Sequence, residues 1–461
     1  MMANGMIDLI PRKYQRLMID WVIDRQRCAL WAEMGTGKTV SVYSALDTLW
    51  MAGSNFWPAL VIAPLRVARG VWPREQQKWR DFQHMRVSAI TGTADQRRDA
   101  LRAKADIYTI NFENIEWLFD QLKAERAWPF KVVVVDEATR LKGFRLRKST
   151  KRSKALASIC ARVGRWINLT GTPASNGYID LWGQMYFIDQ GRRLGHSFTA
   201  FKQQWFDEDE YTRLITPKDY AVPQINEAVK DVCLSIRAAD WFDLEKPILS
   251  RIEVELPAKA MRLYKELKRE MYAELDNSTA LNPVNAAACS AKCLQLASGA
   301  VLLEGGKEWR DVHDAKLDAL DSIVSETNGA PLLVSHWWKH DAARILKRFP
   351  FARVIKTQKD EDDWNAGKIQ MALAQYQSLG HGVELQHGGH RLVHYSRWWD
   401  LEVDEQLRAR LGPVRQFQAG YKRPVYEYSL VAVGTADEEV ELRHQTKRAV
   451  QDILLNATRR F

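Results

Sequence analysis

Cysteine is scarce in this sequence, and long apolar runs are absent from it. The five cysteines form no CxxC pair and show no regular spacing, which excludes a disulfide framework and a cysteine-rich zinc site. No apolar run approaches the ~20 residues of a membrane helix, and the start of the chain lacks the apolar core of a secretory signal. We therefore expect a reduced, cytoplasmic protein with buried thiols and no membrane segment.

Length and charge bound the organisation of the protein. A chain of 461 residues is too long for one ordinary core, so two domains are predicted. Hydrophobic residues make up 46% and charged residues 27%, a balance typical of globular proteins. Lys and Arg number 67 against 57 Asp and Glu, and this excess favours a polyanionic partner, because clustered cations release the counterions condensed on phosphate. Charge alone does not establish that the partner is a nucleic acid.

The pattern of apolar residues predicts an α/β fold. Short apolar runs alternate with amphipathic stretches, as in a parallel sheet covered by helices. We predict a first lobe at 1–190, a helical insertion at 191–250, and a second lobe at 251–461 that carries a helical insertion at about 258–310 and a C-terminal helix. The predicted strands are 28–31, 59–63, 106–110, 131–135, 166–169, 251–257, 331–335, 369–374, 391–395 and 425–433.

AEMGTGKT (32–39) follows a predicted strand and precedes an apolar helical stretch at 40–49. Glycines let backbone N–H groups wrap a phosphate, and the N-terminus of the helix adds its positive dipole. In such a loop Lys38 reaches the outer phosphates and the Thr39 hydroxyl ligates Mg²⁺. Ala32 stands where the strict phosphate-loop pattern has its first glycine. The predicted nucleotide-binding residues here are Met34, Gly35, Thr36, Gly37, Lys38 and Thr39.

VVVVDEATRLKG (132–143) supplies the second half of the predicted site. Four valines form a buried strand that holds Asp136 and Glu137 at its end. Hydrolysis needs one carboxylate to hold Mg²⁺ and a neighbour to orient and deprotonate the attacking water. We assign the metal to Asp136 and the water to Glu137, with Lys38 as a further catalytic residue. NLTGTPASN (168–176) follows another strand, and we expect Thr170, Gly171 and Thr172 to couple the Asp-Glu loop to the nucleotide state.

The order and spacing of these motifs resemble superfamily-two helicases, and most closely the Swi/Snf-type ATPases. PRKYQ (11–15), AEMGTGKT, LVIAPLRVARGVW (60–72), DEATRLK and LTGTPASN carry the resemblance in the first half. The similarity covers most of the chain, is weakest at about 185–330, and is strongest to compact members encoded by bacteriophages. It implies two tandem RecA-like lobes, ATP and Mg²⁺ as cofactors, and a place in bacterial or phage-infected host cytoplasm. In that family the position of Gln15 reads adenine.

The second half also resembles this family, with two departures. PLLVSHWWKHDAARI (331–345) and the stretch 364–416 match its remaining motifs, and Gly380 and Gly382 correspond to coupling positions. Glu384 stands where an Asn is common. In the arginine motif Arg410 matches, but Pro413 occupies the position of the second arginine, and Arg415 lies two residues further on. We expect Arg410 or Arg415 to be the catalytic arginine that faces ATP bound between the lobes.

The resemblance also implies a nucleic-acid track across both lobes, on the face away from ATP. Hydroxyls, amides and backbone N–H groups suit phosphate contacts that do not read sequence. The basic stretch at 140–165 is either an extension of this track or a solvated surface. Tryptophans at 337, 338, 398 and 399 favour core packing over base stacking. The predicted contacts are Pro64, Leu65, Arg66, Thr91, Gly92, Asn111, Gln377, Ser378 and Leu379.

The residues together predict a DNA-dependent ATPase and translocase or helicase. The resemblance implies movement along duplex DNA rather than single strands, by a monomer with no protein partner that the sequence identifies. An RNA helicase is the enzymatic alternative. A catalytically weak DNA-binding clamp or recruitment protein is the alternative of another class, and Pro413 is the feature that motivates it.

Overall fold

The computed structural model describes residues 7–54, 57–124, 128–146, 149–210, 215–276, 283–303, 308–376 and 383–459. The chain forms two compact units, which are described separately. Unit 1 comprises Met1–Asp243 with Lys447–Phe461, and unit 2 comprises Leu244–Thr446. The sequence-based boundaries lie at 190 and 250 instead, and they assign 447–461 to the second lobe. Within the described ranges, no helix is both long and apolar enough to cross a bilayer.

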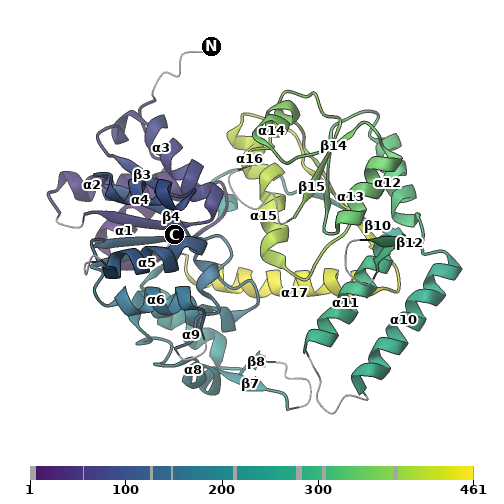
Figure 1. The fold of residues 1–461 in the computed structure, drawn as a ribbon, viewed down its shortest axis with the longest axis horizontal. Helices are drawn as coiled ribbons and strands as arrows, with labels where there is room; N and C mark the ends of the chain where they lie inside the picture. The colour runs from purple at the N-terminus through teal and green to yellow at the C-terminus, as the bar shows by residue number, and fades with distance from the viewer. Residues whose placement is uncertain are drawn as a thin grey trace. The chain divides into compact units, whose positions relative to one another are not determined.

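Unit 1 is built on a seven-stranded parallel sheet with the strand order β3-β4-β2-β5-β6-β1-β9 (Figure 1). Its central strands are buried along their whole length, which explains their continuous runs of valine, isoleucine and alanine. The strands are β1 (Arg27–Ala32), β2 (Ala59–Ala63), β3 (Val87–Ile90), β4 (Ile107–Asn111), β5 (Val132–Asp136), β6 (Arg165–Thr170) and β9 (Cys233–Ile236).

Helices cover both faces of this sheet. Leu60 and Ile62 of β2 pack in the core beneath α5, α6 and α7, and Val61 packs in the opposite core beneath α1, α2 and α3. The helices are α1 (Lys13–Asp24), α2 (Lys38–Met51), α3 (Trp72–Lys78), α4 (Ala94–Arg102), α5 (Ile115–Ala124), α6 (Lys151–Cys160), α7 (Leu181–Asp189), α8 (Phe198–Trp205) and α9 (Ala221–Val229). Short helical turns are η1 (Val67–Val71), η2 (Arg80–Phe82), η3 (Phe112–Asn114), η4 (Ala138–Leu141), η5 (Tyr178–Asp180) and η6 (Ala238–Asp240).

The segment 191–250 differs from the helical insertion expected there. It contains α8 and α9, but also the antiparallel pair β7 (Phe206–Glu208) and β8 (Ile215–Pro217) and the edge strand β9. β9 pairs with β1 from Ala29↔Cys233 to Ala32↔Ile236 and so belongs to the main sheet. A strand of four residues has too little pattern to be told from the amphipathic segments around it.

Unit 2 contains a six-stranded parallel sheet with the order β10-β17-β16-β13-β15-β14. Leu407 and Leu411 of α15 pack on one face of it, and Leu320 of α12 and Ile345 of α13 pack on the other. The strands are β10 (Ile248–Val254), β13 (Leu332–His336), β14 (Ala352–Val354), β15 (Met371–Gln375), β16 (Arg391–His394) and β17 (Tyr426–Ala432), and the short hairpin is β11 (Ala300–Leu302) with β12 (Trp309–Asp311). Two parallel sheets flanked by helices confirm the predicted fold class.

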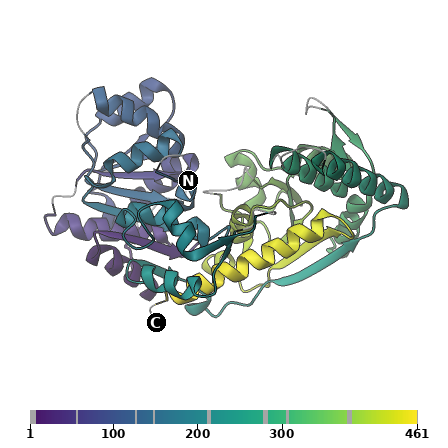
Figure 2. The ribbon, with the colours of Figure 1, turned by 90° about the horizontal axis from the view of Figure 1, so that it is seen from below.

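The helices of unit 2 are α10 (Ala258–Asp276), α11 (Pro283–Ser298), α12 (Ala315–Glu326), α13 (Lys339–Arg348), α14 (Gln358–Asn365), α15 (Leu401–Leu411) and α16 (Pro413–Gln418). The last helix, α17 (Ala436–Ala457), is continuous and begins in unit 2 (Figure 2). Its end belongs to unit 1 because Leu454 and Leu455 are buried in the core there, and the backbone N–H of Ser235 donates to the carbonyl of Thr458 at 3.2 Å. All five cysteines are buried and unpaired.

Candidate active site

Three neighbouring strands of unit 1 bring the predicted catalytic motifs to one edge of the sheet. The order β5-β6-β1 puts β6 between the other two, with Asp136 paired to Leu169 and Trp31 paired to Thr170. Because parallel strands share one carboxyl edge, the loop after β1, the acidic pair at the end of β5 and the threonines at the end of β6 are adjacent.

The loop between β1 and α2 has the backbone shape of a phosphate cradle. Gly35 and Gly37 adopt left-handed φ angles of 82° and 83°, which other residues adopt only at a cost. A Cβ added at Gly37 would lie 2.4 Å from Nε2 of Gln15, so the end of that side chain would have to move. α2 begins at Lys38, and the first N–H groups of that helix and its positive dipole end therefore face the loop.

The side chains of Lys38 and Thr36 both donate hydrogen bonds to backbone carbonyls at the start of this loop. Nζ of Lys38 donates to the carbonyl of Ala32 at 2.6 Å and approaches that of Glu33 at 3.3 Å. Oγ1 of Thr36 donates to the carbonyl of Glu33 at 2.7 Å. These bonds hold the ammonium group at the loop, where a phosphate would be attracted to it.

Glu33 anchors the loop to the edge strand β9, a role that the sequence did not reveal. Its backbone N–H donates to the carbonyl of Ile236 at 3.0 Å, and its carboxylate accepts from the backbone N–H of Ala238 at 2.9 Å. Arg237 lies 3.8 Å from this carboxylate and 3.4 Å from that of Asp452 on α17. Burial raises the pKa of Glu33, against the hydrogen bond from Ala238 and the charge of Arg237.

Gln15 connects the start of α1 to the phosphate loop. Its Oε1 accepts from the backbone N–H of Arg12 at 2.8 Å, and its Nε2 donates to the carbonyl of Thr36 at 3.4 Å. Beside it, Tyr14 is buried against Trp241 and Phe242 with ring centroids 5.8 and 5.5 Å apart. The amide is thus positioned by both the helix start and the loop that it would share with a nucleotide.

Asp136 is buried at the end of β5 and has a specific donor. Nε1 of Trp72 on α3 donates to Oδ2 of Asp136 at 3.0 Å. Burial raises the pKa of this carboxyl, while the Trp72 bond and the charge of Lys38 act in the opposite direction. A carboxylate that burial disfavours gains from a cation, and oxygen ligands are those that Mg²⁺ prefers. The chemistry of Asp136 therefore suits this ion, and Thr39, the second residue of α2, stays a predicted ligand.

Glu137 has an unusual backbone conformation. Its φ of 63° and ψ of 57° lie in the left-handed region, which costs a residue with a side chain about 1–2 kcal/mol. Such conformations persist only where the surroundings over-determine them, and they concentrate at functional sites. The side chain is 9% exposed, so its carboxylate is largely shielded from bulk water.

The threonine motif after β6 contacts both neighbouring loops. Oγ1 of Thr170 lies 2.8 Å from Oγ1 of Thr139, in the turn that follows the acidic pair, and accepts from the backbone N–H of Thr172 at 3.0 Å. A Cβ at Gly171 would lie 3.4 Å from the carbonyl of Ala32 and 3.6 Å from Cγ of Met34. The motif therefore joins the acidic pair to the phosphate loop.

The predicted first-lobe track lies on the other three strands of the same edge. In the order β3-β4-β2, Ala63 pairs with Asn111 and Ile90 pairs with Ile110, so the loops after them are level. Leu65 and Arg66 are exposed, and Pro64 and Thr91 are buried. Gly92 is exposed and has a φ of 91°.

Asn111 is 4% exposed and engaged within the protein. Its Nδ2 donates to Oε2 of Glu113 at 2.8 Å, and its Oδ1 accepts from Asn114 at 2.6 Å. Arg140 pairs with Glu113 at 3.1 Å and lies 5.1 Å from the centre of the Phe112 ring. The side chain of Asn111 therefore positions the loop after β4 rather than facing solvent.

The basic stretch at 140–165 is partly structural. Lys142 donates to Ser175 at 2.9 Å, and Arg145 donates to the carbonyls of Lys142 and Phe144 at 2.9 and 2.6 Å. Arg165 is 4% exposed and donates to the carbonyl of Arg25 at 2.5 Å. The exposed cations of α6 are Lys151, Arg152 and Lys154.

In unit 2, Gln406 and Arg410 lie on α15 and are buried, with exposed fractions of 4% and 7%. α15 ends at Leu411, and Pro413 begins α16, where proline suits the first turn because that turn needs no N–H. Arg415 lies on α16, and its Nη1 is 3.7 Å from the Glu384 carboxylate. Both departures from the family pattern are thus close to Arg415: Glu384 pairs with it, and Pro413 begins the helix that carries it.

Part of the predicted second-lobe set falls outside the described residues. Trp337, Trp338, Trp398 and Trp399 are described, and all are half-buried. The rings of Trp337 and Trp398 stack at 5.3 Å with an interplanar angle of 11°. The predicted contacts and coupling positions that lie outside the described ranges are Gln377, Ser378, Leu379, Gly380 and Gly382.

Comparisons with known proteins identify relatives over nearly the full chain. The SNF2-related domain matches residues 14–297. Protein p41 of Acyrthosiphon pisum secondary endosymbiont phage 1 is 47% identical over 458 residues, which cover 98% of this chain and 99% of that protein. This match spans both units.

Two bacterial relatives are longer. A protein of Mycoplasma genitalium named as an uncharacterized ATP-dependent helicase is 24% identical over 96% of this chain, and one of Bacillus subtilis named as an ATP-dependent helicase/translocase is 23% identical over 97%. The chain spans 42% and 49% of their lengths. The solved SWI2/SNF2 ATPase core of Sulfolobus solfataricus in complex with dsDNA is 22% identical, with a TM-score of 0.45 and coverage of 99% of this chain and 95% of that one.

Proposed function

The chain belongs to the SNF2-related domain family, and on this premise we propose that it is a nucleic-acid-dependent ATPase that moves along duplex DNA. One observation carries the proposal: three features lie together at the sheet edge formed by β5, β6 and β1. They are the loop with its two left-handed glycines, the buried acidic pair, and Thr170, which contacts the turn after that pair. Phosphoryl transfer depends on such positioning and on charge stabilisation more than on covalent chemistry.

The residues of unit 1 divide the work of ATP hydrolysis. Lys38 holds the outer phosphates, and Gln15 reads the base from the rim of the loop. Thr39 and Asp136 would hold Mg²⁺, which would supply positive charge against the phosphates. Glu137 orients the attacking water and accepts its proton from a site that is largely shielded from solvent. Thr170 transmits the state of the site through Thr139 to the turn after the acidic pair.

An arginine of unit 2 supplies positive charge to the transferring phosphoryl group. Arg410 is the first candidate, because it matches the family motif and is buried on a helix that is packed on the sheet. Arg415 is the second. Such an arginine is worth ~10³ or more in rate. Intact Lys38, Asp136 and Glu137 argue against the catalytically weak clamp, because a protein that only binds has little use for all three.

The nucleic acid contacts the strand ends of β2, β3 and β4 in unit 1. Exposed Arg66, the Gly92 turn and backbone N–H groups suit phosphate contacts that hold a strand without reading its sequence. The Bacillus subtilis relative, named as a helicase/translocase, supports movement as the output. The protein works as a monomer in this proposal.

ATPase assays with duplex DNA, single-stranded DNA, forks and RNA test the proposal. We expect duplex DNA to stimulate turnover most strongly and Lys38→Ala to abolish the stimulation. Stimulation by RNA but not by DNA would identify an RNA helicase. Absence of ATPase activity, with DNA affinity unchanged by ATP, would identify the catalytically weak DNA-binding or recruitment protein.

A further inference from the structure

Asp404 is the centre of a buried charge network in unit 2 that the proposed reaction does not use. It lies on α15 and is 2% exposed. Nε of Arg408, one turn along the helix, donates to Oδ2 of Asp404 at 2.8 Å, and Nε of Arg397 lies 3.4 Å from Oδ1. The hydroxyl of Tyr376 donates to Oδ1 at 3.3 Å. This carboxylate is therefore surrounded by donors from three segments of the chain.

The network extends across neighbouring strands beneath α15. The Tyr376 hydroxyl, which follows β15, lies 2.6 Å from Nδ1 of His394 at the end of β16 and 3.1 Å from Ser335 of β13. On β17, Glu427 is 4% exposed and pairs with Nη1 of Arg408 at 2.6 Å. Arg408 thus joins a carboxylate of its own helix to one of the sheet.

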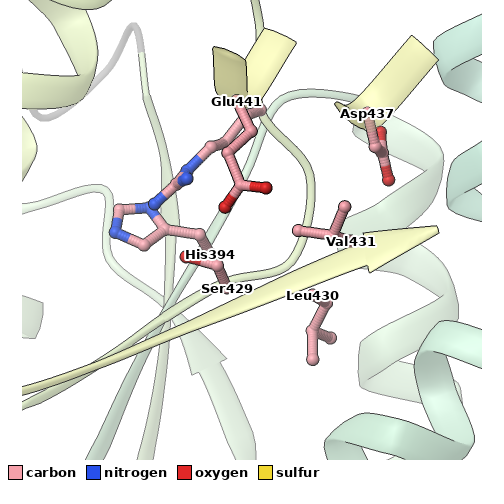
Figure 3. Close-up of a pocket in the computed structure, with 7 residues that line it drawn as sticks. His394, Ser429, Leu430, Val431, Asp437 and Glu441 are labelled. Atoms are coloured by element: carbon pink, nitrogen blue, oxygen red, sulfur yellow. The ribbon is translucent and has the colours of Figure 1, made fainter. Parts of the chain in front are cut away.

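A small cavity adjoins this network. Its lining includes His394, Arg397 and, from α17, Asp437 and Glu441. Figure 3 shows the side chains of His394, Glu441 and Asp437 around it. His444, a turn further along α17, has its Nδ1 3.8 Å from Oδ2 of Asp404. α17 therefore also borders the network.

Stability alone is a poor reason for these buried charges. Replacing a buried ion pair with apolar side chains of similar volume is often neutral or stabilising, whereas removing one partner is strongly destabilising. Leu407 and Leu411 already attach α15 to the sheet by apolar contacts with the core of Leu333 and Leu392. Directional bonds add what apolar contacts lack, because they define the rotation and register of the helix.

The helix periodicity relates this network to the candidate arginine. Asp404 and Arg408 are four residues apart and share one face, while Gln406 and Arg410 are also four apart and lie on the opposite face. A rotation of α15 would move both faces together. We propose that the Asp404–Arg408 pair is a positioning clamp that orients Arg410 for ATP hydrolysis. This inference rests on the proposed function, in which Arg410 acts on the nucleotide.

Arg408→Gln tests the clamp, with Arg344→Gln as the matched control. Arg344 lies on α13, away from α15, and is also buried, with 5% exposure. It pairs with Asp314 at 2.8 Å. With duplex DNA and saturating ATP, we expect Arg408→Gln to lower kcat about 10- to 100-fold, because a misplacement near 1 Å can cost 10². Affinity for a fluorescent ATP analogue should change less than about two-fold, since the phosphate loop belongs to unit 1. Arg344→Gln should keep the wild-type kcat.

A double variant separates positioning from general destabilisation. If the clamp acts through Arg410, Arg408→Gln in an Arg410→Ala background should slow turnover no further. Additive losses, or a folded Arg408→Gln protein with wild-type kcat, would overturn the clamp. If Arg408→Gln does not fold, Tyr376→Phe replaces it as the test, because it removes only the hydroxyl that donates to Asp404. A three-fold or larger loss of kcat in Tyr376→Phe supports the clamp. An unchanged kcat in this variant overturns it. Wild-type turnover in Arg410→Ala alone would instead overturn the arginine of the proposed function, and the clamp with it.

Discussion

Nε1 of Trp72 donates a 3.0 Å hydrogen bond to Oδ2 of Asp136, so an indole from α3 orients the carboxylate expected to hold Mg²⁺. Groups that orient a metal ligand affect metal affinity without touching the metal. The contact joins residues that are 64 positions apart in the chain. If Asp136 holds Mg²⁺ as proposed, Trp72 should therefore affect the metal dependence of ATP hydrolysis.

We predict that Trp72→Phe raises the Mg²⁺ concentration for half-maximal ATP turnover about 10-fold. The matched control is Trp182→Phe, which also removes the hydrogen bond of a buried tryptophan, here to the carbonyl of Gly195 at 2.9 Å. Both variants should lose about 1–2 kcal/mol of unfolding free energy. A Mg²⁺ titration of Trp72→Phe that coincides with the wild type would contradict the proposed metal site.

Glu137→Gln should lower stimulated turnover at least about 100-fold while ATP still binds, because the amide cannot accept the proton of the attacking water. Glu137→Gly should lose turnover equally. Its free energy of unfolding should not decrease, since glycine removes the left-handed strain of this position. Urea unfolding and single-turnover assays measure the two effects. Half of the wild-type turnover in either variant would refute the assignment of Glu137.

Arg410→Ala and Arg415→Ala distinguish the two candidate arginines. We expect Arg410→Ala to lower kcat about 10³-fold and Arg415→Ala to have the smaller effect. Arg415 pairs with the exposed carboxylate of Glu384, and such surface pairs contribute about 0–1 kcal/mol. Glu384→Gln should therefore leave the unfolding midpoint unchanged. Near-normal kcat in both arginine variants would exclude an arginine of this motif.

The buried His394 predicts how stability changes with pH. Burial lowers its pKa to about 4, against an ordinary value near 6.5. Between these values the unfolded chain binds a proton that the folded protein does not, so the free energy of unfolding falls as pH is lowered from 6.5 to 4, by at most about 1.4 kcal/mol per pH unit for this group. Below that window, loss of the Asp404 charge, whose pKa lies well below its usual value, destabilises further.

His394→Asn should therefore flatten the pH dependence of the urea unfolding midpoint between 6.5 and 4. The slope should not vanish, because burial also lowers the pKa of His313, His336 and His390. An identical slope in His394→Asn and the wild type would show that His394 is not held neutral.

The phosphate loop and the acidic pair could be predicted because their signals are local. Glycine spacing, a preceding buried strand and a following helix suffice to place Lys38 and Asp136 at one sheet edge. Trp72 and Glu33 could not be predicted, since their partners lie far away in the chain and each resembles an ordinary core or loop residue. β9 could not be predicted either, because four residues at a sheet edge carry too little pattern.

The clamp on α15 shows a different limit. Asp404 and Arg408 are four residues apart, a spacing that is typical of a surface ion pair on a helix. Only the fold shows that β16 and β17 cover this pair and that Glu427 completes it. On this helix, the resemblance to superfamily-two helicases predicts a catalytic role only for Arg410, which lies on the opposite face.

Movement along duplex DNA is the central claim, and displacement of a third strand from a triplex measures it most directly. A translocase that reaches the triplex along the flanking duplex removes the third strand with ATP, whether or not it separates the duplex. We predict ATP-dependent displacement by the wild type that requires a duplex flank, and none by Lys38→Ala or Glu137→Gln. Strong duplex-stimulated ATP hydrolysis without displacement would contradict translocation, and displacement by Lys38→Ala would contradict the proposed ATP site.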